Sequence, residues 1–303
     1  MSLRTPNPFT NRQTLLDLQR TKERLAILNE QLASGRRIVR LGDDPTGSAL
    51  IVDFKTSIER NKQYEKQIAS ARSFLRASET SLGTLSDGLA RLLELGQQGL
   101  SDTTGASGRP RLAQEVDGLR SNFLSISNTQ SGGKYLFAGT RTTTEPFSGP
   151  SAGPIAYAGD NASIDLDVSV GAAITTNLTG DRVFFGPGGQ GSASDLFQAV
   201  TDLRDGLSTN NRALIQSAYD NLQTIHGRLQ DLTTEVGGRQ ASLDQLEESL
   251  GSFNLSLQSI QSTYEALDYP EAFMEYTREE TAQQAALSTL AKSNQQNLFD
   301  YLG

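Results

Sequence analysis

Few residues of this chain have the type and spacing that catalysis or metal binding requires. The chain contains one histidine, His226, and no cysteine, so disulfides, thiolate ligands and cysteine nucleophiles are excluded. No second histidine can pair with His226, and a lone histidine beside an apolar helix face is usually a surface residue. Asp43 and Asp44 could form a carboxylate pair, but helix capping explains them more simply because Pro45 follows.

Two other segments resemble ligand-binding motifs without matching them. The glycine-rich segment 186–191 lacks the Gly-Lys-Ser/Thr that a phosphate-binding loop needs. Asp160, Asp165 and Asp167 lack the spacing and the glycine of a calcium loop. Asp165 and Asp167 alternate with apolar residues, which is typical of the solvent face of a strand. The residues therefore predict no enzyme, no cofactor and no metal.

The composition restricts the possible partners. The formal charge is −8 over 303 residues, which argues against nonspecific binding to nucleic acid or to an anionic membrane. No apolar run approaches the roughly 18 residues that a membrane span needs. Residues 1–13 have no apolar core and no small-residue cleavage site, so they are not a signal peptide. Export by a route that reads no cleavable signal remains possible.

Two interleaved seven-residue series dominate the chain and predict one long helix that packs against another. Proline is absent from this stretch, and a continuous helix over 222–267 would be about 70 Å long. Arg239 is the polar exception: it either snorkels from a loosely packed point or marks the register of the partner helices. We expect helix from Asp195 onward. The series are Leu222, Leu229, Val236, Leu243, Leu250, Leu257, Tyr264 and Ile225, Leu232, Arg239, Leu246, Phe253, Ile260, Leu267.

Shorter periodic stretches precede this one. A helix is predicted from about Asn11 to Gly35, and a second, long helix begins at Pro45 and frays near 96–108. A third runs from Leu112 until Ser131. The first helix carries Leu18, Leu25, Leu28 and Leu32 on one face, and the second carries Ile68, Leu75, Leu82 and Leu89.

Between the helices, residues 134–191 are rich in glycine, serine and threonine, and apolar residues recur with a period of two. Strands are expected at Tyr135–Phe137, 164–168, Ala173–Leu178 and Arg182–Phe185. An insert this small should depend on the helical body for stability.

A last helix follows Pro270, with Phe273, Tyr276, Leu287 and Leu290 on an apolar face that also holds polar residues. The chain closes on an apolar cluster of Leu298, Phe299, Tyr301 and Leu302. The predicted fold is mainly α: a long antiparallel helical bundle or coiled coil built from both chain ends, with a small antiparallel β insert in the middle. Its predicted domains are a terminal helical domain (1–44 and 268–303), a long-helix bundle (45–133 and 192–267) and the β insert (134–191).

Several ordered motifs resemble the flagellin superfamily. At the start of the chain they are Leu32–Ile38, Asp43–Gly47, Arg91–Leu95 with Gln98, Ser127–Thr129, Gly133–Thr140 and Pro146–Phe147, and near its end Gly238–Gln240 with Leu243 and Glu247. The tyrosine-containing Lys134–Thr140, the small insert and the ending 297–302 favour a component of the hook–filament junction over filament flagellin. Asn297 and Gly42 depart from the usual pattern.

The resemblance implies export through the flagellar type III channel and assembly, outside the cell, at the hook–filament junction. Expected partners are further copies of the chain, the other junction protein, flagellin, the filament cap and an export chaperone. Expected contact residues are Leu18, Leu25, Leu28, Leu32, Arg36, Asp43, Asp44, Phe273, Leu287, Leu290, Leu298, Phe299, Tyr301 and Leu302. Two alternatives remain: filament flagellin, and a type III secretion tip or translocator protein, which would need an apolar membrane-inserting segment.

Overall fold

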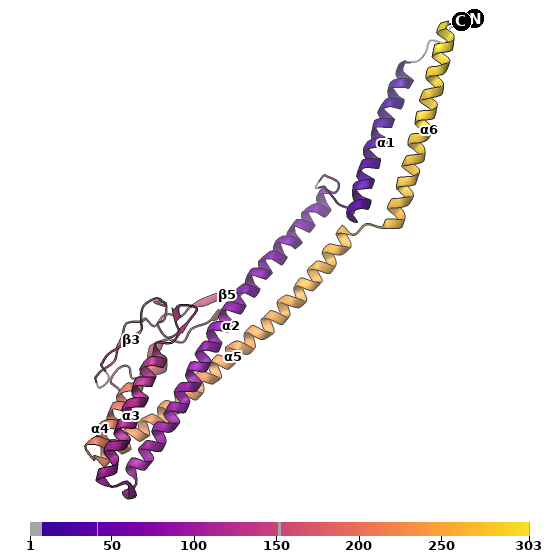
Figure 1. The fold of residues 1–303 in the computed structure, drawn as a ribbon. Helices are drawn as coiled ribbons and strands as arrows, with labels where there is room; N and C mark the ends of the chain where they lie inside the picture. Colours follow the sequence, from indigo (N-terminus) through magenta and orange to yellow (C-terminus); the bar gives the residue numbers. More distant parts are fainter. Residues whose placement is uncertain (1–7, 41, 151–152, 303) are drawn as a thin grey trace. The chain divides into compact units, whose positions relative to one another are not determined.

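Six α-helices account for most of the chain in the computed structural model, which describes residues 8–40, 42–150 and 153–302 (Figure 1). The long helices come from both halves of the chain, with small antiparallel strand pairs between them, so the predicted fold class is confirmed. Two compact units form: a terminal unit of Met1–Arg60 with Ser252–Gly303, and an inner unit of Asn61–Gly251. The helices are α1 (Pro8–Ser34), α2 (Pro45–Leu100), α3 (Gly105–Ser127), α4 (Leu196–Ser208), α5 (Arg212–Glu265) and α6 (Tyr269–Leu302).

The heptad positions of α2 and α5 form the core of the inner unit. Ile68, Leu75, Leu82 and Leu89 of α2 are fully buried, and they share one hydrophobic cluster with α5. The contributions of α5 include Leu222, Ile225, Leu229, Val236 and Leu243. Since a seven-residue repeat keeps one face of a helix toward its partner, the sequence pattern accounts directly for this core.

A continuous helix from Asp195 to Leu267 is wrong, because the chain turns between α4 and α5. Asn210 adopts a left-handed backbone conformation with φ of 55°, which a helix interior does not allow. The side chain of Asn211 then accepts a hydrogen bond from the backbone N–H of Leu214 at 3.2 Å and so caps α5. At the other end of α4, the Asp195 carboxylate accepts from the N–H groups of Phe197 and Gln198.

The turn between α2 and α3 is shorter than predicted. A 3₁₀ turn at Asp102–Thr104 leads directly into α3, so the expected fraying over 96–108 is wrong except at this turn, because α2 continues to Leu100 and α3 begins at Gly105. The buried guanidinium of Arg109 donates to the carbonyl oxygens of Gly99 and Ser101 at 2.7 and 3.4 Å. It therefore satisfies carbonyl groups at the end of α2 and allows α3 to begin early.

Three antiparallel strand pairs form in the described part of the middle segment, residues 130–191. They are β1 (Gln130–Ser131) with β2 (Lys134–Tyr135), β3 (Phe147–Ser148) with β4 (Ala156–Tyr157), and β5 (Asp165–Ser169) with β6 (Ala172–Thr175). The predicted strand at Arg182–Phe185 is wrong: Asp181–Phe185 form a π-helical turn whose phenylalanines are buried. The Phe184 ring stacks on Phe197 of α4 with centroids 5.6 Å apart, so the segment packs on the helical body.

Arg239 fulfils neither of its two predicted roles. Its guanidinium donates to the carbonyl oxygens of Thr175 and Asn177 at 3.1 and 3.0 Å, and it pairs with Glu235 one turn earlier. Arg239 therefore attaches the end of β6 to α5 instead of meeting a partner helix. The polar interruption of the α5 heptad series is therefore the point at which the middle segment attaches to α5.

Candidate assembly surface on the terminal unit

The first and last helices pack against each other in the terminal unit, with α1 beside α6 (Figure 1). The α1 face consists of residues in alternating steps of four and three, of which Leu18 and Leu28 are buried and Leu25 and Leu32 are half-buried. These four predicted contact residues therefore stabilise the helix pair within one chain.

The face of α6 that meets α1 differs from the predicted one. The half-buried or buried positions are Ala272, Tyr276, Glu279, Gln283, Ala286 and Leu290, again in steps of four and three. Phe273 and Leu287, predicted to share this face, are instead 61% and 48% exposed. Because each residue turns the helix by about 100°, a shift of one position moves a side chain off the seam. Leu290 lies on the seam as predicted.

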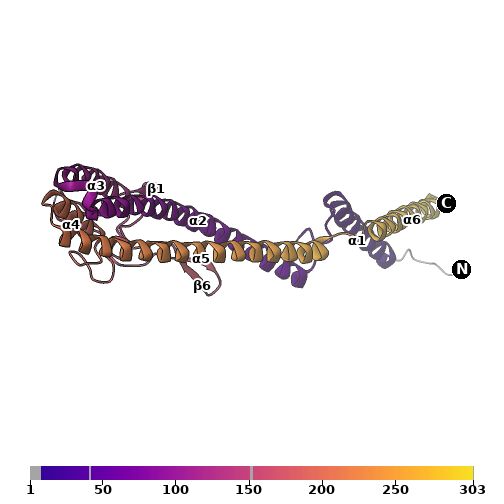
Figure 2. The same cartoon turned by 90° about the horizontal axis from the view of Figure 1, so that it is seen from below.

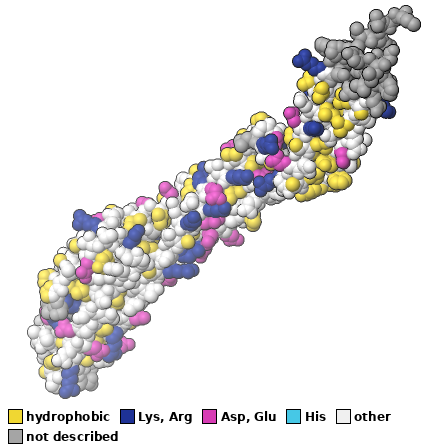
Figure 3. Space-filling view, turned by 45° about the horizontal axis from the view of Figure 1, so that its top comes forward, with side chains coloured by type: hydrophobic (Ala, Val, Ile, Leu, Met, Phe, Trp, Pro, Cys, Tyr) yellow, Lys and Arg dark blue, Asp and Glu magenta, His cyan; other side chains and the backbone are white. Residues whose placement is uncertain are grey.

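Exposed apolar side chains concentrate on the terminal unit, as Figure 3 shows for one face. Among the described residues, every exposed large hydrophobic side chain except Val170 belongs to this unit. We call this set the apolar surface: Leu15, Leu16, Ile27, Leu50, Val52, Phe253, Leu255, Ile260, Tyr264, Tyr269, Phe273, Met274 and Leu287. Such a concentration is typical of a surface that another protein covers.

The predicted seam of α5 contributes to this surface. Leu250 and Leu257 are buried, but Phe253, Ile260 and Tyr264 are 55%, 41% and 39% exposed. The prediction of a seam buried as far as Leu267 is therefore wrong for three of its five positions beyond Leu250. A helix packed on a single partner buries only a narrow strip, whereas in the inner unit α3 and α4 also contribute to the core.

The residues that follow α1 form backbone hydrogen bonds with the residues at and just after the end of α5. We call this pairing the backbone bridge. Arg36 pairs with Ala266 in antiparallel fashion, the N–H of Arg37 donates to the Glu265 carbonyl at 2.8 Å, and the N–H of Leu267 donates to the Gly35 carbonyl at 3.3 Å. Gly35 ends α1 with φ of +69°, as the sequence predicted. A side chain there would be strained, and its Cβ would lie 2.6 Å from the Tyr269 hydroxyl.

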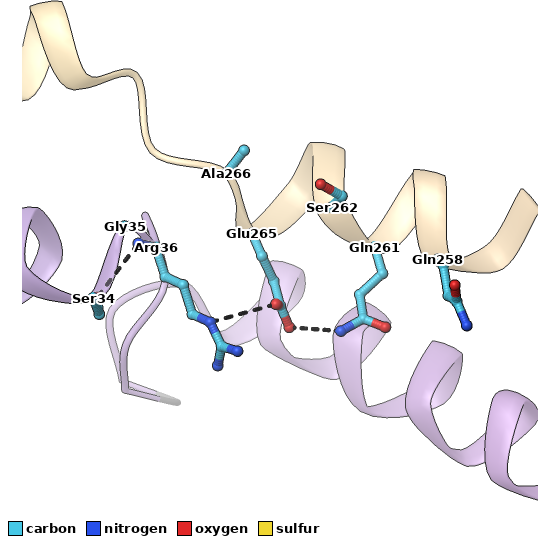
Figure 4. Close-up of a pocket in the computed structure, with 8 residues that line it drawn as sticks. All are labelled: Ser34, Gly35, Arg36, Gln258, Gln261, Ser262, Glu265 and Ala266. Atoms are coloured by element: carbon cyan, nitrogen blue, oxygen red, sulfur yellow. Dashed lines mark hydrogen bonds and ion pairs between the residues drawn. The ribbon is translucent and has the colours of Figure 1, made fainter. Parts of the chain in front are cut away.

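Glu265 holds this bridge together and lines a pocket of about 390 Å³ (Figure 4). Its carboxylate lies 3.2 Å from Lys55 Nζ and 3.7 Å from Arg36 Nε, and it accepts from Gln261 Nε2 at 3.0 Å. Burial alone would raise the pKa of Glu265, but the hydrogen bonds from Gln261 and Lys55, together with the two positive charges, lower it below the ordinary value. Arg36, a predicted contact residue, is thus engaged within the chain.

Asp44 caps the start of α2, as the capping interpretation predicted, whereas Asp43 closes the turn before it and does not cap the helix. Asp43 accepts from the N–H of Arg40 at 2.9 Å, and Asp44 accepts from the N–H of Gly47 at 2.9 Å. The hydrogen bond from Gly47, aided by the nearby Arg37 guanidinium, lowers the pKa of Asp44 although partial burial opposes this shift. A Cβ at position 47 would approach Asp44 Oδ2 to 2.5 Å, which explains the glycine.

We expect Glu265→Gln to lower the stability of the terminal unit at neutral pH and to change it little at acidic pH. The folded pKa of Glu265 is depressed, so its stabilisation is fully present above its unfolded value of 4.5 and is lost as pH falls through the folded pKa. Circular-dichroism melts should show the variant below wild type at about pH 7 and close to it at about pH 3. An equal difference at both pH values would contradict this role.

The remaining candidate residues offer no chemistry. His226 Nε2 lies 3.1 Å from Gln230 on a half-buried part of α5. Within the described ranges, no three histidine, aspartate or glutamate side chains group as metal ligands would, and no helix has the length and apolar character to cross a membrane. The backbone of Leu298, Phe299, Tyr301 and Leu302 lies in α6, and their side chains lie outside the described residues.

Comparison with known proteins shows that the chain is similar to flagellar proteins. Residues 9–142 match the bacterial flagellin N-terminal helical region, and the resemblance of the chain to the flagellin superfamily is confirmed. The flagellar hook-associated protein 3 of Escherichia coli K12 is 26% identical over 290 residues, covering 89% of this chain and 90% of that protein. A flagellin of Halalkalibacterium halodurans is 26% identical over 269 residues, covering 88% and 87%.

A solved structure shows the same fold. The flagellar hook associated protein-3 of Legionella pneumophila superposes with a TM-score of 0.63 at 17% identity, covering 70% of this chain and 98% of that one. The hook-associated protein and the flagellin that resemble this chain in sequence are both flagellar proteins, as their names state.

Proposed function

We propose that this protein is a structural component that joins the flagellar hook to the filament and polymerises through its terminal unit. The observation that carries the proposal is the concentration of exposed apolar side chains on that unit. Left in water, these side chains would cost free energy, each large one about 1.5–3 kcal/mol relative to full burial. Copies of the chain that cover one another's apolar surface recover that free energy.

The assembly route in this proposal is export through the flagellar type III channel. A chain without cysteine cannot be cross-linked by disulfides before it is threaded unfolded. Its partners would be further copies of itself, the other junction protein, flagellin and the filament cap, with an export chaperone bound to the C-terminal region beforehand.

The proposed domains are a polymer core (1–44 and 268–303), a bundle (45–133 and 192–267) and a β insert (134–191).

Filament flagellin is the alternative function, because a flagellin is as similar in identity as a hook-associated protein. The short middle segment and the ending 297–302 favour the junction. A type III translocator is a weaker alternative, since no described helix has the length and apolar character to insert into a membrane.

A deletion strain tests the proposal. Loss of a junction protein leaves complete hooks without filaments, and flagellin appears in the medium. Loss of a filament subunit instead shortens or removes filaments while the remaining flagellin stays attached. Complete filaments on the deletion strain would overturn both assignments.

We expect removal of 298–303 to abolish assembly while the monomer stays folded. Leu298, Phe299, Tyr301 and Leu302 cluster at the chain end, where the heptad seams of the body do not require them. The truncated protein should melt at the wild-type temperature, be secreted, and fail to support filaments. Normal swimming would contradict this prediction, and a large drop in melting temperature would show that the cluster stabilises the monomer instead.

A further inference from the structure

Val170 stands apart from the other exposed apolar residues. It is 77% exposed, the largest value among the described large hydrophobic side chains, and it alone lies in the inner unit. It occupies the tip of the hairpin formed by β5 and β6, where Ser169 pairs with Ala172 across the two-residue turn Val170–Gly171. In Figure 2 the hairpin extends beyond α5.

The turn itself does not require an apolar residue at position 170. Gly171 supplies the positive φ of +77° that the turn needs. β-branched residues are uncommon in such turns, where proline, asparagine, aspartate and glycine are preferred. Val170 therefore adds no evident stability to the hairpin and leaves an apolar side chain in solvent.

A groove of about 580 Å³ lies at the base of the same hairpin. Its apolar lining comes from Ala71 and Phe74 of α2 and from Ile164 and Leu166, all buried or half-buried. Hydroxyl groups and two charged residues complete the lining: Ser70, Lys134, Thr140, Thr142, Ser163, Asp165 and Thr176. The groove thus offers an apolar surface with polar groups around it, which suits a projecting apolar side chain on a polar hairpin.

The hairpin of a chain cannot fill its own groove. Asp165 lines the groove while Val170 is five residues further along, about 16 Å away at 3.3 Å per strand residue. A neighbouring copy can supply the missing side chain. The two surfaces also carry opposite charges, Lys134 beside the groove and Asp167 on the hairpin. Both residues are exposed, and neither forms an ion pair within the described parts of the chain.

We propose that the tip of the β5–β6 hairpin of one copy docks in the groove of the next copy, with Val170 against Phe74 and Asp167 near Lys134. The contact is head-to-tail, since the two surfaces that meet are different, and repetition of such a contact builds a ring or a helical array. This inference rests on the proposed self-assembly and adds to it a second contact, outside the terminal unit.

The absence of cysteine makes the contact directly testable. Two variants, Val170→Cys with an epitope tag and Ser70→Cys without one, are made together in the deletion strain, and isolated flagella are oxidised. Ser70 is an exposed residue beside the groove. A disulfide needs Cα atoms within about 7 Å, so a mixed dimer forms only where tip and groove meet. The control replaces Ser70→Cys by Ser121→Cys, which lies exposed on α3.

We expect the mixed dimer with Ser70→Cys in assembled flagella, and no such band with Ser121→Cys or with the purified monomers. Complete flagella that give no mixed dimer, or equal amounts with both partners, would overturn the docking while leaving the junction function intact. Val170→Ser provides the second test: the monomer melt stays unchanged, and the filaments detach at lower shear than wild type. Wild-type resistance to shear would also overturn the inference.

Discussion

Leu229→Asp is expected to abolish the cooperative folding of the inner unit. Leu229 is fully buried on α5 within the hydrophobic cluster that also contains Leu75 and Leu82 of α2. A carboxylate there loses its hydration without gaining a partner, and such substitutions cost several kcal/mol. Domains of this size are stable by only about 5–15 kcal/mol, so one such change removes much of the total.

Circular-dichroism melts of three variants on the same helix test this expectation. Thr234→Asp places the same charge on an exposed position and should melt like wild type. Leu246→Asp, at a half-buried position, should fall between the two. If Leu229→Asp melts within a few degrees of wild type, α5 does not bury this face against α2.

Phe273→Asp combined with Leu287→Asp is expected to have the largest effect on assembly while sparing the monomer. Both side chains are exposed on α6, so two carboxylates there leave the α1–α6 seam intact. In the polymer they would be buried against a neighbouring copy without a counter-charge, which disrupts the contact. Cells carrying the double variant should secrete the protein and form hooks without filaments.

Leu28→Asp is the matched comparison. Leu28 is 5% exposed on the seam of α1, so its replacement should lower the melting temperature of the terminal helices as well as assembly. Wild-type filaments with the double variant, or an equal loss of monomer stability in both variants, would show that the exposed face of α6 does not carry the contact.

Heptad spacing correctly predicted which residues of α2 and α5 are buried in the core of the inner unit. Ile68 to Leu89 and Leu222 to Leu243 are buried as the pattern indicated, since the repeat and the partner helix lie in the same unit. The pattern failed where a helix face has no partner in the unit and where small or polar residues form the seam. Phe253 and Ile260 follow the repeat but are exposed, and Ala272, Glu279 and Gln283 line the α6 seam although none is strongly apolar.

Some of the residues that stabilise the terminal unit were predictable from the sequence, and others were not. The C-terminal glycine of α1 and the aspartate cap of α2 were predictable, because Gly35 and Asp44 act on their own backbone neighbours. Glu265 was not, because its partners Arg36 and Lys55 are distant in sequence and nothing adjacent distinguishes it from other glutamates. The missed residues of the apolar surface, such as Val52, Leu255 and Met274, had a weak signal in being apolar residues outside the heptad series.

Immunogold labelling of isolated flagella tests the central claim most directly. An epitope tag fits at the turn Asp102–Thr104 between α2 and α3, where Asp102 is exposed and no residue belongs to either proposed contact. If the chain is a junction protein, we expect one narrow band of label at the boundary between hook and filament on each flagellum. Label distributed along the filament would contradict it and assign the chain to filament flagellin.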